Sequence, residues 1–183
     1  ATFPINGLVN SHTISDLDGD GDRDLSLIKF NTATFRPEIV VLTNDGTGGF
    51  SSRVLPFVLY IYSAHIESGD LDNDGDLDMI VNNMNQEAFV YHNQSMENKV
   101  GNYIAVKLIG NNKNLKSIGA RVMLAYEGKK IQIGECTNTR GFLSTSQTVL
   151  HFGLGNVQTI DSIFIRWQDG KYMRIDNPKV NTT

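Results

Sequence analysis

Apolar and polar residues alternate in short runs along the chain, and runs with a helical period are scarce. The runs are rich in β-branched and aromatic residues and are bounded by Gly, Asn and Asp, which is typical of strands joined by turns. The predicted strands cover residues 25–30, 38–44, 53–62, 78–83, 88–93, 103–110, 120–126, 130–136, 148–154, 162–168 and 171–176. Asp169-Gly170 is a strong hairpin signal between the last two. The pattern therefore predicts an all-β fold.

One part of the pattern occurs twice. DLDGDGDRDL begins at Asp16 and DLDNDGDLDM at Asp70, 54 residues later, and each leads into an apolar strand and then a second strand. A period near 50 residues with about four strands is typical of a propeller blade. The repeat stops by about residue 95. We expect about two blade units of a partial β-propeller in residues 1–97 and a β-sandwich or barrel-like domain in residues 98–183.

Charge divides the chain at the same place. Residues 1–100 carry 5 Lys and Arg against 15 Asp and Glu, whereas residues 101–183 carry 11 against 5. The C-terminal cations are spread and alternate with apolar residues, which indicates the polar faces of strands and not a nucleic-acid surface. No run approaches the roughly 20 apolar residues that cross a membrane. We therefore expect neither a nucleic-acid partner nor membrane insertion.

The two repeated segments predict metal sites. Each places a carboxylate at positions 1, 3, 5, 7 and 9 and a glycine at position 6. Like charges this close favour a cation among them, and Ca²⁺ takes six to eight oxygen ligands from a flexible loop. Alternate residues of an extended segment point the same way, and the glycine permits the curl that brings them together. The predicted metal-binding residues of two Ca²⁺ sites are Asp16, Asp18, Asp20, Asp22 and Asp24, and Asp70, Asp72, Asp74, Asp76 and Asp78.

Other interpretations of the loops fit less well. An EF-hand needs Glu at position 12 and flanking helices, but Leu27 and Val81 stand there and both flanks are predicted strands. Mg²⁺ prefers to keep waters and is rarely held by protein oxygens alone. A solvated acidic turn without metal is the remaining alternative, and the second copy at matched spacing disfavours it.

These motifs resemble known families. DLDGDGDRDL and GDLDNDGDLDMIVNN, with NDGTGGF between them, resemble the FG-GAP/VCBS-type repeats of integrin-like β-propellers over about residues 10–95. The resemblance implies Ca²⁺ in each loop, bound by the side chains at positions 1, 3, 5 and 9 and by the carbonyl oxygens of Asp22 and Asp76. NYIAVKLIG, SIGARVMLAY, RGFLSTSQ, LHFGLG and SIFIRWQDG resemble an ASPIC/UnbV domain over about residues 102–183. That family commonly follows such repeats in secreted proteins.

The chain carries no sign of catalysis. It lacks HExxH, GxSxG and P-loop motifs, and its four histidines are scattered. Trp167 is interpreted as a core residue in preference to an exposed platform for a sugar. Cys136 is interpreted as a small buried residue. We therefore expect a protein that is not an enzyme.

Two blade units cannot close a propeller ring. We expect a fragment of a longer protein, or two units packed on the C-terminal domain. The beginning of the chain has no basic or apolar leader, so we expect any targeting peptide to have been removed.

The predicted function follows from these features. We expect a non-catalytic, calcium-binding protein that is secreted, periplasmic or on the cell surface. Its expected role is adhesion or the binding of a protein or glycan ligand, with Ca²⁺ stabilising the repeat loops. The alternative is a fragment of a carbohydrate-active enzyme whose catalytic region lies outside these residues.

Overall fold

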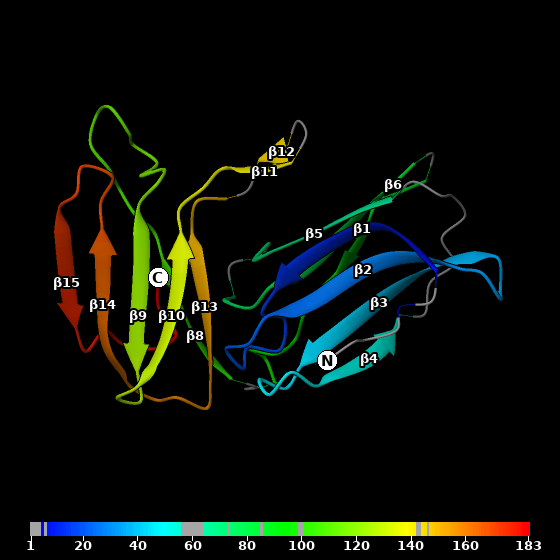
Figure 1. Ribbon diagram of the computed structural model, residues 1–183, viewed down its shortest axis with the longest axis horizontal. Coiled ribbons are helices and arrows are strands. Elements are labelled where there is room, and N and C mark those ends of the chain that lie inside the picture. Colours follow the sequence, from blue (N-terminus) through cyan, green and yellow to red (C-terminus); the bar gives the residue numbers. More distant parts are fainter. Residues whose placement is uncertain are drawn as a thin grey trace. The chain divides into compact units, whose positions relative to one another are not determined.

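The fold is all-β, as predicted. A computed structural model describes residues 5, 7–55, 64–72, 74–84, 86–98, 101–141, 144–145 and 147–183. Its regular elements are strands, which form two compact units, Ala1–Lys99 and Val100–Thr183 (Figure 1). Within these residues there is no helix long and apolar enough to cross a membrane. Each unit is described by itself below.

Unit 1 consists of two antiparallel sheets whose strands follow each other in chain order. The first sheet contains β1 (Leu8–Ser15), β2 (Asp24–Asn31), β3 (Arg36–Asn44) and β4 (Phe50–Val54). The second contains β5 (Ala64–Gly69), β6 (Asp78–Asn83) and β7 (Phe89–Tyr91). Such meanders are the form of propeller blades. The predicted strand 53–62 begins inside β4, and its residues 56–62 lie outside the described part of the chain.

The two sheets of unit 1 share a core. Ile28 and Ile39 of the first sheet pack with Ile66, Met79 and Val81 of the second, and all five are buried. Burying an aliphatic side chain of this size stabilises a fold by roughly 1.5–3 kcal/mol relative to leaving it exposed. The apolar faces of the two sheets therefore hold unit 1 together.

The strands that precede the Asp loops were not among the predicted runs. β1 has the sequence LVNSHTIS and mostly exposed side chains, and β5 has the sequence AHIESG. Both are held by pairing: β1 pairs with β2, and β5 pairs with β6. Ser11 Oγ also accepts a hydrogen bond from the Ile66 amide at 3.2 Å, which joins β1 to β5. Backbone pairing forms these strands without a continuous apolar face.

Unit 2 is a sandwich of sheets around a single core. One sheet has the order β10 (Lys130–Glu135), β9 (Arg121–Tyr126), β14 (Ile160–Arg166), β15 (Tyr172–Asp176). β8 (Asn102–Val106) pairs with β13 (Leu150–Gly155), and β11 (Thr139–Gly141) with β12 (Ser144–Thr145). The buried residues of this core are Ile104, Val106, Leu108, Ala120, Val122, Leu124, Tyr126, Cys136, Phe152, Leu154, Val157, Ile160, Ile163 and Ile165. Trp167 is half-buried and packs against this core.

Candidate metal centre

The first Asp loop runs from Asp16 to Asp24 and joins β1 to β2. Gly21 has a φ of 98°, a conformation that a residue without Cβ adopts at little cost. The Gly21 amide donates to Asp16 Oδ2 at 3.0 Å, and the Asp22 amide donates to Asp20 Oδ1 at 2.8 Å. Short-range bonds from backbone amides to aspartate side chains favour turns. They curl the loop as the sequence predicted.

Asp24 anchors this loop to the sheet. Its side chain is 1% exposed. Its Oδ2 accepts a hydrogen bond from the Leu17 amide at 2.7 Å, and its Oδ1 accepts one from the Asn44 amide at 2.9 Å. Arg23, immediately before it, is exposed. Asp24 therefore connects the start of the loop to the end of β3.

The second loop repeats this geometry between β5 and β6. Gly75 has a φ of 103°. Asp78 is 2% exposed and accepts hydrogen bonds from the amides of Leu71 at 3.0 Å and Asn93 at 2.8 Å. Buried Leu77 stands in the position that Arg23 has in the first loop. The two loops therefore share a positive-φ glycine and a buried aspartate that accepts two amides, and they differ at positions 4 and 8.

The side chain of Asn93 joins the two loops. Its Nδ2 donates to the carbonyl oxygen of Leu17 at 2.7 Å and to that of Leu77 at 3.2 Å. The matching residue of the first repeat is Asn44, whose Nδ2 donates to the carbonyl oxygen of Arg23 at 3.4 Å. The bond to Leu17 connects the second repeat to the loop of the first.

The structure brings together some of the predicted metal ligands. Carboxylate oxygens approach within 4.8 Å of one another in two groups, Asp16 with Asp18 and Asp24, and Asp70 with Asp72 and Asp74. A third group joins Asp72 and Asp78 to His92. The Asp22 carboxylate lies beside Gly46, where an added Cβ would be 2.3 Å from Oδ2. Asp76 Oδ2 accepts a bond from the Met96 amide at 3.0 Å, and Asp20 is exposed and outside these groups.

Several loop oxygens are buried without a hydrogen-bond partner. Within the described part of the chain these are Asp16 Oδ1, Asp70 Oδ1, Asp74 Oδ2 and Asp76 Oδ1. A buried polar atom without a partner costs roughly 1–3 kcal/mol. Four such atoms in two matched loops are the arrangement expected where a bound cation completes the set of contacts.

Burial makes several carboxyl groups of the loops harder to ionise. The pKa of Asp16 is raised to about 7, mainly by burial and next by the charge of Asp20. Burial also raises the pKa of Asp18 to about 6, with the charges of Asp24 and Asp20 as further causes. The pKa values of Asp24, Asp74 and Asp76 are raised by burial as well. A divalent cation among these groups would favour their charged forms.

His92 and Glu97 belong to the second cluster and were not predicted. His92 Nδ1 lies 3.2 Å from Asp72 Oδ2 and 3.3 Å from Asp78 Oδ1, and its Nε2 lies 2.8 Å from Glu97 Oε1. The hydrogen bond that His92 Nε2 donates to the Glu97 carboxylate raises the pKa of His92. The first repeat has Thr43 at the position of His92. Comparison of the two repeats in the sequence therefore did not indicate His92 as a member of the site.

The donor atoms of the two loops suit a hard cation. The groups of the first loop consist of carboxylate oxygens, which are preferred by Ca²⁺ and Mg²⁺. The flexible loop supplies several oxygens from one segment, as Ca²⁺ accepts and Mg²⁺ rarely does. The residues present therefore fit a calcium ion in each loop.

Two family models match separate parts of the chain. Residues 8–81 match the family model described as FG-GAP-like repeat, and residues 110–183 match the one described as ASPIC and UnbV. The two regions occur in the predicted order, so the predicted resemblance is confirmed. No curated protein matches the chain.

Proposed function

We propose, for a chain that consists of an FG-GAP-like repeat region followed by an ASPIC and UnbV region, that the repeat region binds two calcium ions, one in each Asp loop. The ions stabilise unit 1 and take no part in catalysis. The protein acts outside the cytosol, where calcium reaches millimolar concentrations, in adhesion or in the binding of a protein or glycan ligand.

The buried, unpartnered carboxylate oxygens of Asp16, Asp70 and Asp74 carry this proposal. They occur in both loops, beside neighbouring carboxylates. A loop that needed no cation would turn these oxygens to solvent or pair them with backbone amides, as Asp24 and Asp78 do. Carboxylate oxygens that lack hydrogen-bond partners in both loops support the binding of a cation that several of them contact.

The first ion would be held by Asp16, Asp18 and Asp24, with Asp20 joining from the exposed side of the loop. The second would be held by Asp70, Asp72, Asp74 and Asp78. Asp22 and Asp76 would contribute their main-chain carbonyl oxygens, because their carboxylates are directed to Gly46 and to the Met96 amide. Each ion supplies two positive charges to a cluster of like charges.

Calcium removal tests the proposal through the melting temperature. A ligand at one hundred times its Kd stabilises the folded state by about 2.7 kcal/mol. For a unit of this size that corresponds to a melting temperature higher by on the order of 10 °C. We expect EGTA to lower the melting temperature by such an amount, and added calcium to restore it.

Variants in the two loops test whether their carboxylates bind the calcium ions. Asp18→Ala and Asp72→Ala should each remove part of the calcium-dependent gain, because each removes a carboxylate of a close group. Asp176→Ala is the control, since it deletes an exposed carboxylate of unit 2. Equal melting curves with calcium and with EGTA would contradict calcium binding, and a normal calcium response in both loop variants would place the ions elsewhere.

A further inference from the structure

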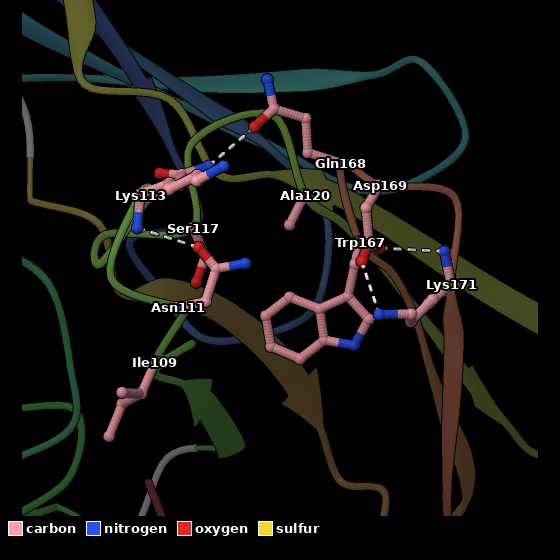
Figure 2. A pocket seen from close by; sticks show the side chains of 11 residues that line it. Ile109, Asn111, Lys113, Ser117, Ala120, Trp167, Gln168, Asp169 and Lys171 are labelled. Atoms are coloured by element: carbon pink, nitrogen blue, oxygen red, sulfur yellow. Dashed lines mark hydrogen bonds and ion pairs between the residues drawn. The ribbon is translucent and has the colours of Figure 1, made fainter.

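A cavity of about 720 Å³ opens at one end of unit 2. It lies between the segment after β8, residues 109–117, and the turn between β14 and β15, residues 167–171. Figure 2 shows the indole of Trp167 facing this space, with Ile109 and Asn111 across from it. The volume falls within the roughly 300–1,000 Å³ of small-molecule sites.

A second, smaller cavity shares two lining residues with the first. It measures about 250 Å³ and is lined in part by Arg121, Glu135 and Arg166. Trp167 and Gln168 line both cavities. Together the two spaces suit an elongated ligand that passes over the tryptophan.

Ser117 gives the cavity wall an unsatisfied polar atom. Its side chain is 2% exposed, and its Oγ has no hydrogen-bond partner within the described residues. Its backbone is fixed, because its amide donates to the Asn114 carbonyl at 3.0 Å and its carbonyl accepts from the Ala120 amide at 3.0 Å. A buried hydroxyl without a partner is costly, and a ligand in the cavity would supply the missing bond.

The cavities carry an excess of positive charge. Their walls contain Lys113, Lys171, Arg121 and Arg166, against Asp169 and Glu135. Both carboxylates are already paired, Asp169 with Lys171 at 3.0 Å and Glu135 with Arg121 at 2.8 Å. Of the carboxylates that the structure describes, none forms an ion pair with Lys113 or Arg166. Two cations therefore remain for an anionic ligand.

The polar side chains of the wall are held in place by one another. Asn114 Nδ2 donates to Gln168 Oε1 and to the Ile118 carbonyl, both at 2.9 Å. Asn111 Oδ1 accepts from the Lys113 amide at 3.0 Å. These bonds use the amide oxygens of Gln168 and Asn111 and leave their NH₂ groups as donors. A positioned set of donors favours a ligand rich in oxygen acceptors.

We propose that this site binds a short acidic oligosaccharide built from hexuronate units. The C–H face of one sugar ring packs on the indole of Trp167, and a carboxylate pairs with Lys113 or Arg166. Ring hydroxyls exchange hydrogen bonds with Ser117 Oγ and with the amides of Asn111 and Gln168. The second cavity accommodates a neighbouring sugar unit. This proposal rests on the glycan binding proposed above and names its ligand and site, but because no loop aspartate takes part, it does not depend on calcium binding in unit 1.

The single tryptophan of the chain makes a direct assay possible, because all indole fluorescence comes from this site. The full chain is titrated with trigalacturonate and, for comparison, with the neutral trisaccharide maltotriose. We expect saturable fluorescence changes with both, and an affinity for the acidic sugar about tenfold higher at low salt, because of the unpaired cations. No change with either sugar, or equal affinity for both, would overturn the proposal. Tighter binding of AMP than of trigalacturonate would also overturn it, in favour of a nucleotide site.

Two variants test the contacts. Ser117→Ala should weaken trigalacturonate binding about threefold to tenfold without lowering the melting temperature, because it removes a hydroxyl that is unpaired in the free protein. Lys113→Ala should weaken binding of the acidic sugar and leave binding of maltotriose unchanged. Lys129→Ala is the matched control, since it deletes an exposed lysine of the β9–β10 turn. Unchanged trigalacturonate affinity in both test variants, or an equal loss in the control, would contradict the assigned site.

Discussion

At the scale of single residues, the aspartates of each loop divide into two kinds. Asp24 and Asp78 are almost fully buried, and each accepts two backbone amides. In Asp24 these amide bonds offset part of the rise in pKa that burial causes. Asp16 and Asp18, in contrast, face other carboxylates and are raised in pKa by burial and by those charges. The first kind connects the loop to the sheet. The second kind forms a group of close carboxylates that a cation would stabilise.

This difference predicts how stability depends on pH without calcium. The pKa of Asp16 rises from 3.8 to about 7 on folding and that of Asp18 to about 6. The folded state therefore binds more protons than the unfolded state between these values, and stability falls as pH rises from about 4 to 7. The raised pKa of His92 acts in the same direction.

The measurement is the melting temperature at pH 5 and at pH 8, for protein stripped of calcium and for protein saturated with it. We expect the stripped protein to melt at a lower temperature at pH 8 than at pH 5. Saturating calcium should remove most of that difference, because the cation favours the ionised carboxylates. A stripped protein that is more stable at pH 8 would contradict the prediction.

At the scale of elements, the strands predicted most closely are those whose apolar residues in the sequence are also buried in the structure. β2, β6 and β14 carry β-branched residues that are buried in the structure, and all three lie close to their predicted ranges. β1 and β5 carry polar side chains and exist because a neighbouring strand pairs with them, which no local pattern shows. The carboxylates and the glycine turn of each loop were predictable because they lie within one nine-residue motif.

The contacts that the sequence did not predict are those that join distant segments. His92 reaches the second loop from the end of β7, and Asn93 reaches the first loop across 76 positions. Neither has a distinctive neighbourhood in the sequence. Trp167 was interpreted as a core residue, and the structure places it against the core and also in a cavity wall. A half-buried tryptophan can contact the core and line a cavity at once, and the residue type alone does not distinguish these two roles.

The bond between Asn93 and Leu17 predicts coupling between the repeats. Asn93→Ala removes donors from the carbonyl oxygens of Leu17 and Leu77, at a cost of roughly 1–3 kcal/mol. Because Leu17 lies within the first loop, we expect calcium affinity to fall there as well as in the second loop. Isothermal titration calorimetry of the two binding steps measures both effects.

Asn44→Ala is the matched comparison. It removes the weaker bond, 3.4 Å long, to the carbonyl oxygen of Arg23, and the local turn bond that Asn44 Oδ1 accepts from the Gly46 amide at 3.1 Å. We expect it to cost less stability and to leave the affinity of the second loop unchanged. If the two variants had the same effect on both binding steps, the bond to Leu17 would not couple the repeats.

At the scale of the whole chain, the Asp loops and the tryptophan-lined cavities lie in different units. All ten loop aspartates lie in unit 1, whereas the sole tryptophan and the donor-lined cavities lie in unit 2. Each unit has its own buried core. A domain with its own core can unfold on its own.

We therefore predict that calcium affects the unfolding of one unit only. Scanning calorimetry should show two transitions, of which EGTA lowers one. Tryptophan fluorescence, which reports on unit 2, should follow the transition that EGTA leaves unchanged. A single transition that moves with EGTA when it is followed by fluorescence would show that the units unfold together.

The exposed arginine of the first loop gives calcium a further consequence. Trypsin cleaves after Arg23, which stands between two aspartates of the loop, and the second loop has Leu77 at that position and offers no such bond. A protease needs its substrate as an extended segment, whereas a curled, ion-filled loop resists that shape. If the proposed ion is bound, the calcium concentration would thereby set how long the first repeat survives in the presence of a trypsin-like protease, and a fall in calcium would lead to irreversible cleavage within the repeat region.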